Sequence, residues 1–148
     1  MASARDLIKS KENASIFLIS ADATAFDAMK LMSTHNIGAL LIKDLDGNVQ
    51  GIVSERDFIL KLEVLGYVPQ ETPISQIMTE NVLYVESTQS LEECMALMNE
   101  KSVRHLPVFD GKKLIGMISI RDVLREIILE QKSMISHLEH YIHGGTQQ

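Results

Sequence analysis

The chain contains an internal repeat, and this repeat constrains the fold more than any other feature. The segment DATAFDAMKLMSTHNIGALLIKDLDGNVQGIVSERDFI, within residues 16–62, returns about 65 residues later as STQSLEECMALMNEKSVRHLPVFDGKKLIGMISIRDVL. Chemistry is repeated together with hydrophobic pattern, because GIVSERD at residues 51–57 matches GMISIRD at residues 116–122. A repeat of this kind predicts an architecture built from two similar units.

Length and charge narrow the class of protein. A chain of 148 residues with 45% hydrophobic content can bury a core, and about two-thirds of the unfolded surface should be hidden on folding. The net charge of -6 argues against a dedicated nucleic-acid binder but leaves small anionic ligands open. Cys94 is the only cysteine, so it is expected to be a small core residue of a cytosolic protein, with no redox or nucleophilic role.

The sequence carries no sign of a membrane protein. No apolar run approaches the ~18 to 20 residues that span a bilayer, and the N-terminus lacks the apolar segment of a signal peptide. These features predict a soluble, cytoplasmic protein without membrane contact.

Each copy predicts the order β-α-β-β-α. A Ser or Thr followed three residues later by an acid, at Thr24/Asp27 and Ser90/Glu93, is typical of a helix start. The apolar positions that follow have helical spacing and predict one buried face in both copies; they are Ala25, Ala28, Met29, Met32 and Leu91, Cys94, Met95, Met98. Strands are predicted over 15–19, 37–42, 49–53, 82–85, 103–109 and 114–119, and closing helices over 55–64 and 120–142.

The two copies should form one α+β module. The closing helices carry matched apolar residues, which are Phe58, Ile59, Leu62 and Val123, Leu124, Ile127. Pro107 cannot donate to a strand ladder, so its strand should be at an edge there or locally bulged. A half with about three strands exposes a sheet face, so the halves should pack sheet to sheet around a pseudo-two-fold axis. We expect a first repeat over 7–65, a linker over 66–73, a second repeat over 74–130 and a C-terminal extension over 131–148.

The residues that indicate chemistry lie where the last strand of each copy turns into the last helix. Ser54 with Asp57, and Ser119 with Asp122, match a helix cap, which explains either pair taken alone. Two further features favour a ligand site. A glycine three residues before each serine lets another group approach the strand, and an arginine precedes each aspartate. A helix N-terminus with an arginine suits an anion, and a carboxylate suits a sugar cis-diol, so the combination indicates a nucleotide.

This ordered set resembles a tandem pair of cystathionine-β-synthase (CBS) domains in a stand-alone protein. The resemblance covers about residues 7–130 and rests on the duplicated G-h-h-S-x-x-D endings, the NIGALLIKD and VRHLPVFDG strands, and the MTENV segment that precedes the second repeat's first strand. It implies a flat module with two related clefts between the repeats, which bind adenosine-containing ligands, commonly AMP, ADP, ATP, NAD(H) or S-adenosylmethionine. It also implies that such modules dimerise into a disc.

The resemblance assigns roles to individual residues. Asp57 and Asp122 would bind ribose hydroxyls, Ser54 and Ser119 would contact ribose or phosphate, and Thr79 and Val82 would flank the approach to the second repeat's first strand. The candidates for the phosphates are Arg56, Arg121, Arg104 and His105. In similar stand-alone proteins a glycine often occupies the position of Arg121. Main-chain groups of Ile37, Gly38 and Ala39, and of Val103, Arg104 and His105, would read the adenine edge.

The two clefts differ in sequence. Gly38-Ala39 of the first repeat corresponds to Arg104-His105 of the second, so one site offers backbone access and the other offers cationic charge. We expect unequal affinities or different ligands, while a solvated strand face is the alternative explanation for Arg104 and His105.

Beyond the resemblance, residues 129–142 continue apolar positions at roughly helical spacing, and dimer packing is the expected use of this helix. Its histidines, His137, His140 and His143, lie three apart, but they are expected to be surface residues and not metal ligands because no carboxylate or thiolate set accompanies them.

Two functions remain open from the sequence. The preferred hypothesis is a non-catalytic sensor in which an adenine nucleotide stabilises one arrangement of the repeats or of a homodimer, and an unknown regulated protein reads the difference. No residue set resembles a nucleophile with its base, so an enzyme is not expected. The alternative is a dimerisation or docking module whose ligand clefts are vestigial.

Overall fold

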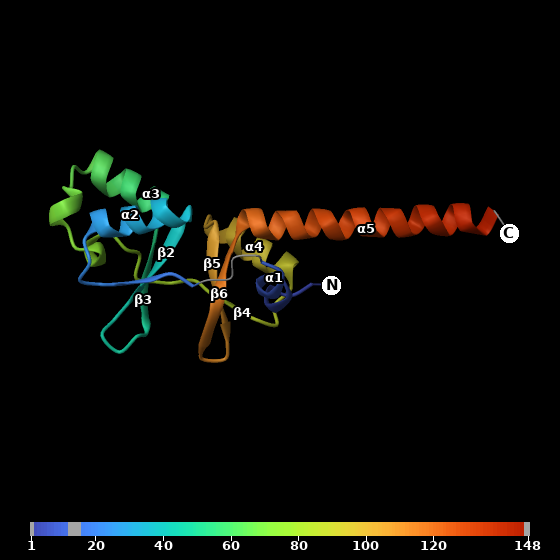
Figure 1. The fold of residues 1–148 in the computed structure, drawn as a ribbon, viewed down its shortest axis with the longest axis horizontal. Coiled ribbons are helices and arrows are strands. Elements are labelled where there is room, and N and C mark those ends of the chain that lie inside the picture. Colours follow the sequence, from blue (N-terminus) through green and yellow to red (C-terminus); the bar gives the residue numbers. More distant parts are fainter. Residues whose placement is uncertain (1, 12–15, 147–148) are drawn as a thin grey trace. The chain divides into compact units, whose positions relative to one another are not determined.

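The computed structural model describes residues 2–11 and 16–146, and these form two compact units. The first unit comprises residues 16–83, and the second combines the described parts of residues 1–15 and 84–148. Each unit contains one three-stranded sheet, with order β1-β2-β3 in the first and β4-β5-β6 in the second (Figure 1).

The first unit follows the predicted order. Its elements are β1 (Leu18–Ser20), α2 (Ala25–His35), β2 (Ala39–Lys43), β3 (Val49–Ser54) and α3 (Glu55–Phe58), which continues as a π-helical segment, Ile59–Val64. Strand β2 is central, since it pairs parallel with β1 and antiparallel with β3. Two short 3₁₀ turns, Pro69–Glu71 and Ile74–Gln76, follow in the segment that leads to the second repeat.

The second unit has the same topology with an additional N-terminal helix. Its elements are α1 (Ala4–Ser10), β4 (Val85–Glu86), α4 (Leu91–Lys101), β5 (His105–Asp110), β6 (Lys113–Ser119) and α5 (Ile120–Thr146). Strand β5 pairs parallel with β4 and antiparallel with β6. The prediction of an α+β protein with two β-α-β-β-α repeats is therefore confirmed, while the packing of one sheet on the other stays a prediction.

The first strand of each repeat is shorter than predicted and begins later. Strand β4 pairs only Val85 with Val108 and Glu86 with Phe109, so the parallel ladder does not reach Pro107. Proline lacks the N–H that such a ladder needs, and the prediction of a local edge is borne out. The bulge between Val108 and Phe109 has a counterpart between Ile42 and Lys43, where no proline occurs, so the bulge belongs to the repeat and is not caused by Pro107.

The predicted helix starts and core faces are largely confirmed. Thr24 Oγ1 accepts from the Asp27 N–H at 3.1 Å, and the Asp27 carboxylate accepts from the Thr24 N–H at 3.2 Å. Ser90 Oγ accepts from the Glu93 N–H at 3.1 Å. The buried helix residues are Ala25, Ala28, Met32, Leu91, Cys94 and Met98.

Three apolar residues were wrongly expected to be buried. Met29 lies at the margin of its helix face and is exposed, and Ile59 and Leu124 are 62% and 43% exposed. Ile59 and Leu124 occupy the same repeat position, directly after the buried Phe58 and Val123, and adjacent residues of a helix point to different sides. The winding also changes from α to π after Phe58, but α5 remains α-helical at Leu124, so the exposure does not depend on this change.

Each unit is completed by the segment that precedes the other repeat in the sequence. Ile74, Ile77 and Met78 are buried in the first unit, whereas Ala4, Leu7 and Ile8 are buried in the second. The backbone bonds correspond as well. The Ile74 N–H donates to Ala23 at 2.7 Å and the Ala25 N–H to Thr72 at 2.8 Å, while the Ala4 N–H donates to Gln89 at 2.8 Å and the Leu91 N–H to Ala2 at 3.2 Å. Sequence repeats and compact units therefore do not coincide.

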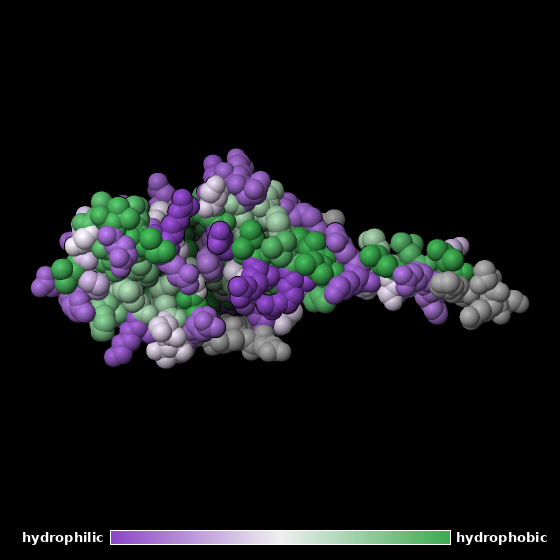
Figure 2. Space-filling view, turned by 90° about the horizontal axis from the view of Figure 1, so that it is seen from above, coloured by the Kyte–Doolittle hydropathy of each residue, from purple (hydrophilic) through white to green (hydrophobic). Residues whose placement is uncertain are grey.

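Helix α5 extends well past the elements that contact it. It packs on α4, β6 and α1 near its start, whereas every described side chain from Gln131 to Ile142 is exposed. Figure 2 shows apolar residues along this exposed part of the helix. No helix of the described residues has both the length and the apolar character needed to cross a membrane.

Candidate functional site

The predicted site residues of the first unit meet where β3 turns into α3. Ser54 pairs with Ala39 across the sheet, and the Glu55 N–H donates to the Gly38 carbonyl at 3.3 Å. The Ser54 N–H donates to Asp57 Oδ2 at 2.9 Å, and the Ser54 hydroxyl donates to the same oxygen at 3.3 Å. The carboxylate is thereby fixed at the N-terminus of the helix.

The second unit repeats this arrangement between β6 and α5. Ser119 pairs with His105, and the Ile120 N–H donates to the Arg104 carbonyl at 2.8 Å. The Ser119 N–H donates to Asp122 Oδ2 at 2.9 Å, and Ser119 Oγ accepts from the Asp122 N–H at 3.1 Å. The residues that the sequence singled out separately in each repeat are thus brought together by the strand pairing.

The segment that completes each unit and precedes the other repeat is called its exchanged segment below; it comprises residues 74–79 in the first unit and 2–11 in the second. The glycine before each serine makes room for a side chain of this exchanged segment. A Cβ at Gly51 would lie 2.5 Å from Met78 Sδ and 3.0 Å from the Thr79 carbonyl oxygen. A Cβ at Gly116 would lie 2.5 Å from Ile8 Cδ1. The close approach predicted for these glycines is present, but the approaching group is protein.

The exchanged segments also reach the two aspartates. In the first unit the Thr79 N–H donates to the Ile52 carbonyl at 2.8 Å, and the Thr79 hydroxyl lies 3.4 Å from Asp57 Oδ1. In the second unit the Lys11 ammonium donates to the Met117 carbonyl at 2.8 Å and to Asp122 Oδ2 at 3.0 Å.

Met117 occupies the repeat position of Ile52, since each follows the glycine of its G-h-h-S-x-x-D ending. In the first unit, the Thr79 N–H binds the strand carbonyl and the Thr79 hydroxyl contacts the aspartate. In the second unit, the single ammonium group of Lys11 makes both of these contacts.

Lys11 was not singled out from the sequence. It follows α1, beyond the apolar triplet that the two exchanged segments share, so no motif marks it. The triplet itself was a usable signal, because A-x-x-L-I at residues 4–8 and I-x-x-I-M at residues 74–78 have the same apolar spacing.

The electrostatics of Asp122 follow from these contacts. Burial raises the pKa of Asp122, but the hydrogen bonds from Ser119 and from Lys11, together with the Lys11 charge, outweigh burial and lower the pKa below its ordinary value. The carboxylate is therefore ionised at neutral pH. The cation that contacts this carboxylate is Lys11 and not the adjacent Arg121.

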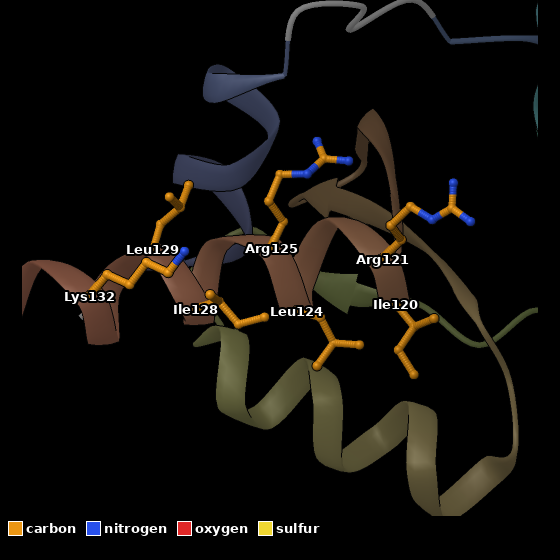
Figure 3. A pocket seen from close by; sticks show the side chains of 7 residues that line it. All are labelled: Ile120, Arg121, Leu124, Arg125, Ile128, Leu129 and Lys132. Atoms are coloured by element: carbon orange, nitrogen blue, oxygen red, sulfur yellow. The ribbon is translucent and has the colours of Figure 1, made fainter.

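Among the described residues, neither Arg56 nor Arg121 forms an ion pair with the aspartate that follows it. Arg56 and Arg104 are exposed. Arg121 lines a shallow groove of about 550 Å³ along α5 (Figure 3). The other residues lining this groove are Ile120, Leu124, Arg125, Ile128, Leu129 and Lys132.

The remaining predicted residues divide between the units. Ile37 and Gly38 are half-buried and Ala39 is buried in the first unit, while Val103 and His105 are half-buried in the second. Thr79 and Val82 precede the second repeat's first strand in sequence but belong to the first unit.

The histidines of α5 form no metal site within the part of the chain that the structure describes. His137 and His140 are exposed, and no cluster of three or more His, Cys, Asp or Glu suited to a metal occurs among the described residues. The side chain of His143 lies outside the described part.

Comparison with known proteins agrees with the fold. The CBS domain family matches residues 3–64 and 74–129. The chain is 36% identical over 148 residues to the mitochondrial CBS domain-containing protein CBSX3 of Arabidopsis thaliana. The matched region covers 95% of this chain and 71% of that protein.

Two solved structures are informative. A putative signal-transduction protein with CBS domains from Burkholderia ambifaria is 42% identical, with a TM-score of 0.84 over 88% of this chain and 96% of that one. A hexameric CBS-CP12 protein from bloom-forming cyanobacteria is 27% identical, with a TM-score of 0.74 over 84% of this chain and 70% of that one.

CBS domains are generally regulatory, non-catalytic modules that commonly bind adenosine nucleotides. The family match covers nearly the whole chain in two copies, and the two β-α-β-β-α units have the fold of the solved CBS proteins. This chain belongs to the CBS domain family as a tandem pair of CBS domains.

Proposed function

We propose that the chain is a non-catalytic sensor that binds adenosine-containing nucleotides, AMP, ADP, ATP or NAD(H), and signals to a regulated partner protein. The observation that carries this proposal is the Ser–Asp pair at the same strand-to-helix junction in both units. In each pair the serine N–H holds one carboxylate oxygen, Oδ2, at 2.9 Å. The carboxylate is oriented in advance, which lowers the entropic cost of binding a pair of sugar hydroxyls.

The charges around the two pairs support different ligand preferences. Around Asp57 the chain places Glu55, Arg56 and the neutral Thr79, which gives a net charge of about -1 by formal charge counting. Counted by position in the chain, the second junction carries Arg104, Arg121 and Lys11 together with Asp122, and Ile120 stands where the first unit has Glu55, so the formal net charge is about +2. Of these cations Lys11 contacts Asp122, whereas Arg121 lines the groove along α5. The second unit should therefore prefer the ligand with more phosphate charge, and S-adenosylmethionine, a cation, suits it least.

Signalling requires that the ligand bind two arrangements of the protein with different affinity. We propose that the chain acts as a homodimer, formed through its CBS modules and its C-terminal helix, and that nucleotide binding shifts the balance between arrangements. The hexamer formed by the cyanobacterial CBS-CP12 relative supports assembly as a property of such chains. The alternative function is a dimerisation or docking module with vestigial clefts.

Calorimetry and thermal shift with AMP, ATP, NAD, NADH and S-adenosylmethionine test the proposal. Asp57→Ala and Asp122→Ala should each weaken a separate binding event by about 1.5–3 kcal/mol, the scale of a lost hydrogen bond to a charged group. Asp46→Ala, in the exposed turn between β2 and β3, is the matched control and should bind as the wild type does.

Because Asp122 also caps α5, Asp122→Asn is measured beside Asp122→Ala to separate lost charge from a lost cap. Wild-type protein that no nucleotide stabilises would leave the docking function as the better explanation. Unchanged titrations in both aspartate variants would mean that the site lies elsewhere.

A further inference from the structure

The far part of α5 has an apolar face with no protein against it among the described residues. Ile135, Leu138 and Ile142 are 56%, 57% and 62% exposed. Helix α5 contacts α4, β6 and α1, but all described side chains from Gln131 to Ile142 are exposed (Figures 1 and 2). An isolated helix gains little from propensity and is stabilised mainly by packing its apolar face, so this length of helix calls for a partner.

The spacing of the apolar residues indicates how a partner helix would pack against α5. One line along α5 advances by four and three residues in strict alternation, and it consists of Leu124, Ile128, Gln131, Ile135, Leu138 and Ile142. This is the a/d pattern of a left-handed coiled coil, with period 3.5. The three a positions are all isoleucine, and the three d positions are Leu124, Gln131 and Leu138.

We propose that this line, the α5 seam, pairs with the α5 seam of a second copy of the chain in a parallel, in-register, two-stranded coiled coil; this rests on the homodimer of the proposed function and specifies its helix contact. β-Branched residues at a with leucine at d favour two parallel strands, and that is the combination present in the seam. The alternative occupants of such a face are a helix of another protein or an antiparallel second copy.

Gln131 decides between the parallel and antiparallel arrangements. In a parallel pair the two Gln131 side chains face each other in one layer, where each amide can donate to and accept from the other. In an antiparallel pair a positions face d positions, so each Gln131 meets an Ile135 and two buried amides lack a partner. Burying an amide without a hydrogen-bond partner is costly, so the parallel register is the more stable form.

The residues beside the seam are compatible with the parallel pair. The g positions Ile127 and Met134 are apolar, and in a parallel pair they face the e positions five residues further along the second copy, which are Lys132 and Glu139. Long charged side chains at e cover apolar neighbours with their methylene stems while the charged groups stay in water. No two like charges are brought together across these g–e pairs.

The seam from Leu124 to Ile142 is short, at roughly 27 Å of helix, and holds fewer than the three to four heptads of a self-sufficient coiled coil. The pairing should therefore be reversible and depend on protein concentration.

Cysteine cross-linking tests the orientation directly in the full-length chain. In a Cys94→Ala background, Leu138→Cys places thiols of two copies face to face in a parallel pair, so mild oxidation should give a disulfide-linked dimer in high yield. Ser133→Cys, an f position on the opposite side of α5, is the matched control and should give little. Equal yields from the two positions, or a higher yield for a mixture of Gln131→Cys and Ile135→Cys chains than for Leu138→Cys, would overturn the parallel seam.

Sedimentation tests the affinity independently. Gln131→Leu should strengthen self-association at least several-fold, and Ile135→Asp with Leu138→Asp should abolish the contribution of the seam, while Ser133→Asp should change neither. Because these side chains are exposed in the single chain, thermal unfolding of the units should be unaffected. An association constant that is the same in all four proteins would contradict the proposal, even if a dimer persisted through another surface.

Discussion

The contact between Lys11 and Asp122 allows a quantitative prediction for Lys11→Met. Methionine retains most of the apolar stem but removes the ammonium group that donates to Asp122 Oδ2 at 3.0 Å and to the Met117 carbonyl at 2.8 Å. The hydrogen bond to the carboxylate is worth about 1.5–3 kcal/mol and the bond to the carbonyl about 0.5–1.5 kcal/mol. The side-chain entropy that Lys11 regains offsets about 1 kcal/mol or more. We expect a net loss of about 2 kcal/mol in the free energy of unfolding.

The loss should depend on pH in a defined direction. The pKa of Asp122 is lower in the folded protein than its ordinary value of 3.8. A carboxylate of this kind stabilises the fold above its unfolded pKa, and the stabilisation disappears as the pH falls through the folded value. The cost of Lys11→Met should therefore be full at pH 6–7 and smaller at pH 2.5, below the ordinary pKa of 3.8, and it should fall toward the cost of the lost carbonyl bond as Asp122 becomes protonated.

Urea unfolding at both pH values measures this cost, and hydrogen exchange of the β6 amides locates it in the second unit. Lys9→Met is the matched control, since Lys9 lies on the same helix and is exposed, and it should cost little. A cost below about 0.5 kcal/mol at neutral pH would place Lys11–Asp122 among ordinary surface pairs and refute the reasoning. A larger cost at pH 2.5 than at neutral pH would contradict an ionic contact.

Two further predictions concern packing and reactivity. Gly116→Ala should destabilise the second unit by about 1–3 kcal/mol, because the new Cβ would meet the Ile8 side chain. Adding Ile8→Ala should recover part of this loss, which a double-mutant cycle measured by urea unfolding would show. Additive losses would contradict the contact. Burial raises the pKa of Cys94 to about 11, so the native thiol should react with a thiol reagent far more slowly at pH 8 than it does in urea. A native rate close to the rate in urea would show that Cys94 is accessible.

Much of the fold could be predicted because the same local patterns occur twice. Thr24 and Ser90 begin helices in both copies, and the buried positions three and four residues apart follow in both. Such signals are local, since a cap and an amphipathic face depend on residues within two turns of each other. The same holds for the Ser–Asp pairs, whose spacing of three residues is sufficient to place the carboxylate on the serine N–H.

The features that could not be predicted depend on contacts distant in sequence. The length of β4 is limited by Pro107, more than 20 residues away, which ends the parallel ladder. The switch from α to π winding after Phe58 is indicated by no residue of the segment. The bond from Lys11 to Asp122 spans 111 positions, and a long flexible side chain that follows a helix gives no periodic signal.

The exchange of segments gives the two aspartates different relations to a ligand. At Asp57 the exchanged segment contributes a neutral hydroxyl at 3.4 Å, a long contact that a ligand hydroxyl can replace at little cost. At Asp122 it contributes an ammonium at 3.0 Å, and the same segment is held by Arg5, which contacts Asp110 at 2.7 Å, and by Ile8 against Gly116.

A ligand that draws on the Asp122 carboxylate therefore shares it with α1. Binding and the docking of α1 become linked, and by thermodynamic reciprocity each changes the free energy of the other by the same amount. The linkage follows from the Lys11 contact alone and does not require any movement between the two units. In the proposed sensor, it is the second unit whose occupancy can be read at the N-terminal helix, while the first unit can bind a ligand without disturbing a charged contact.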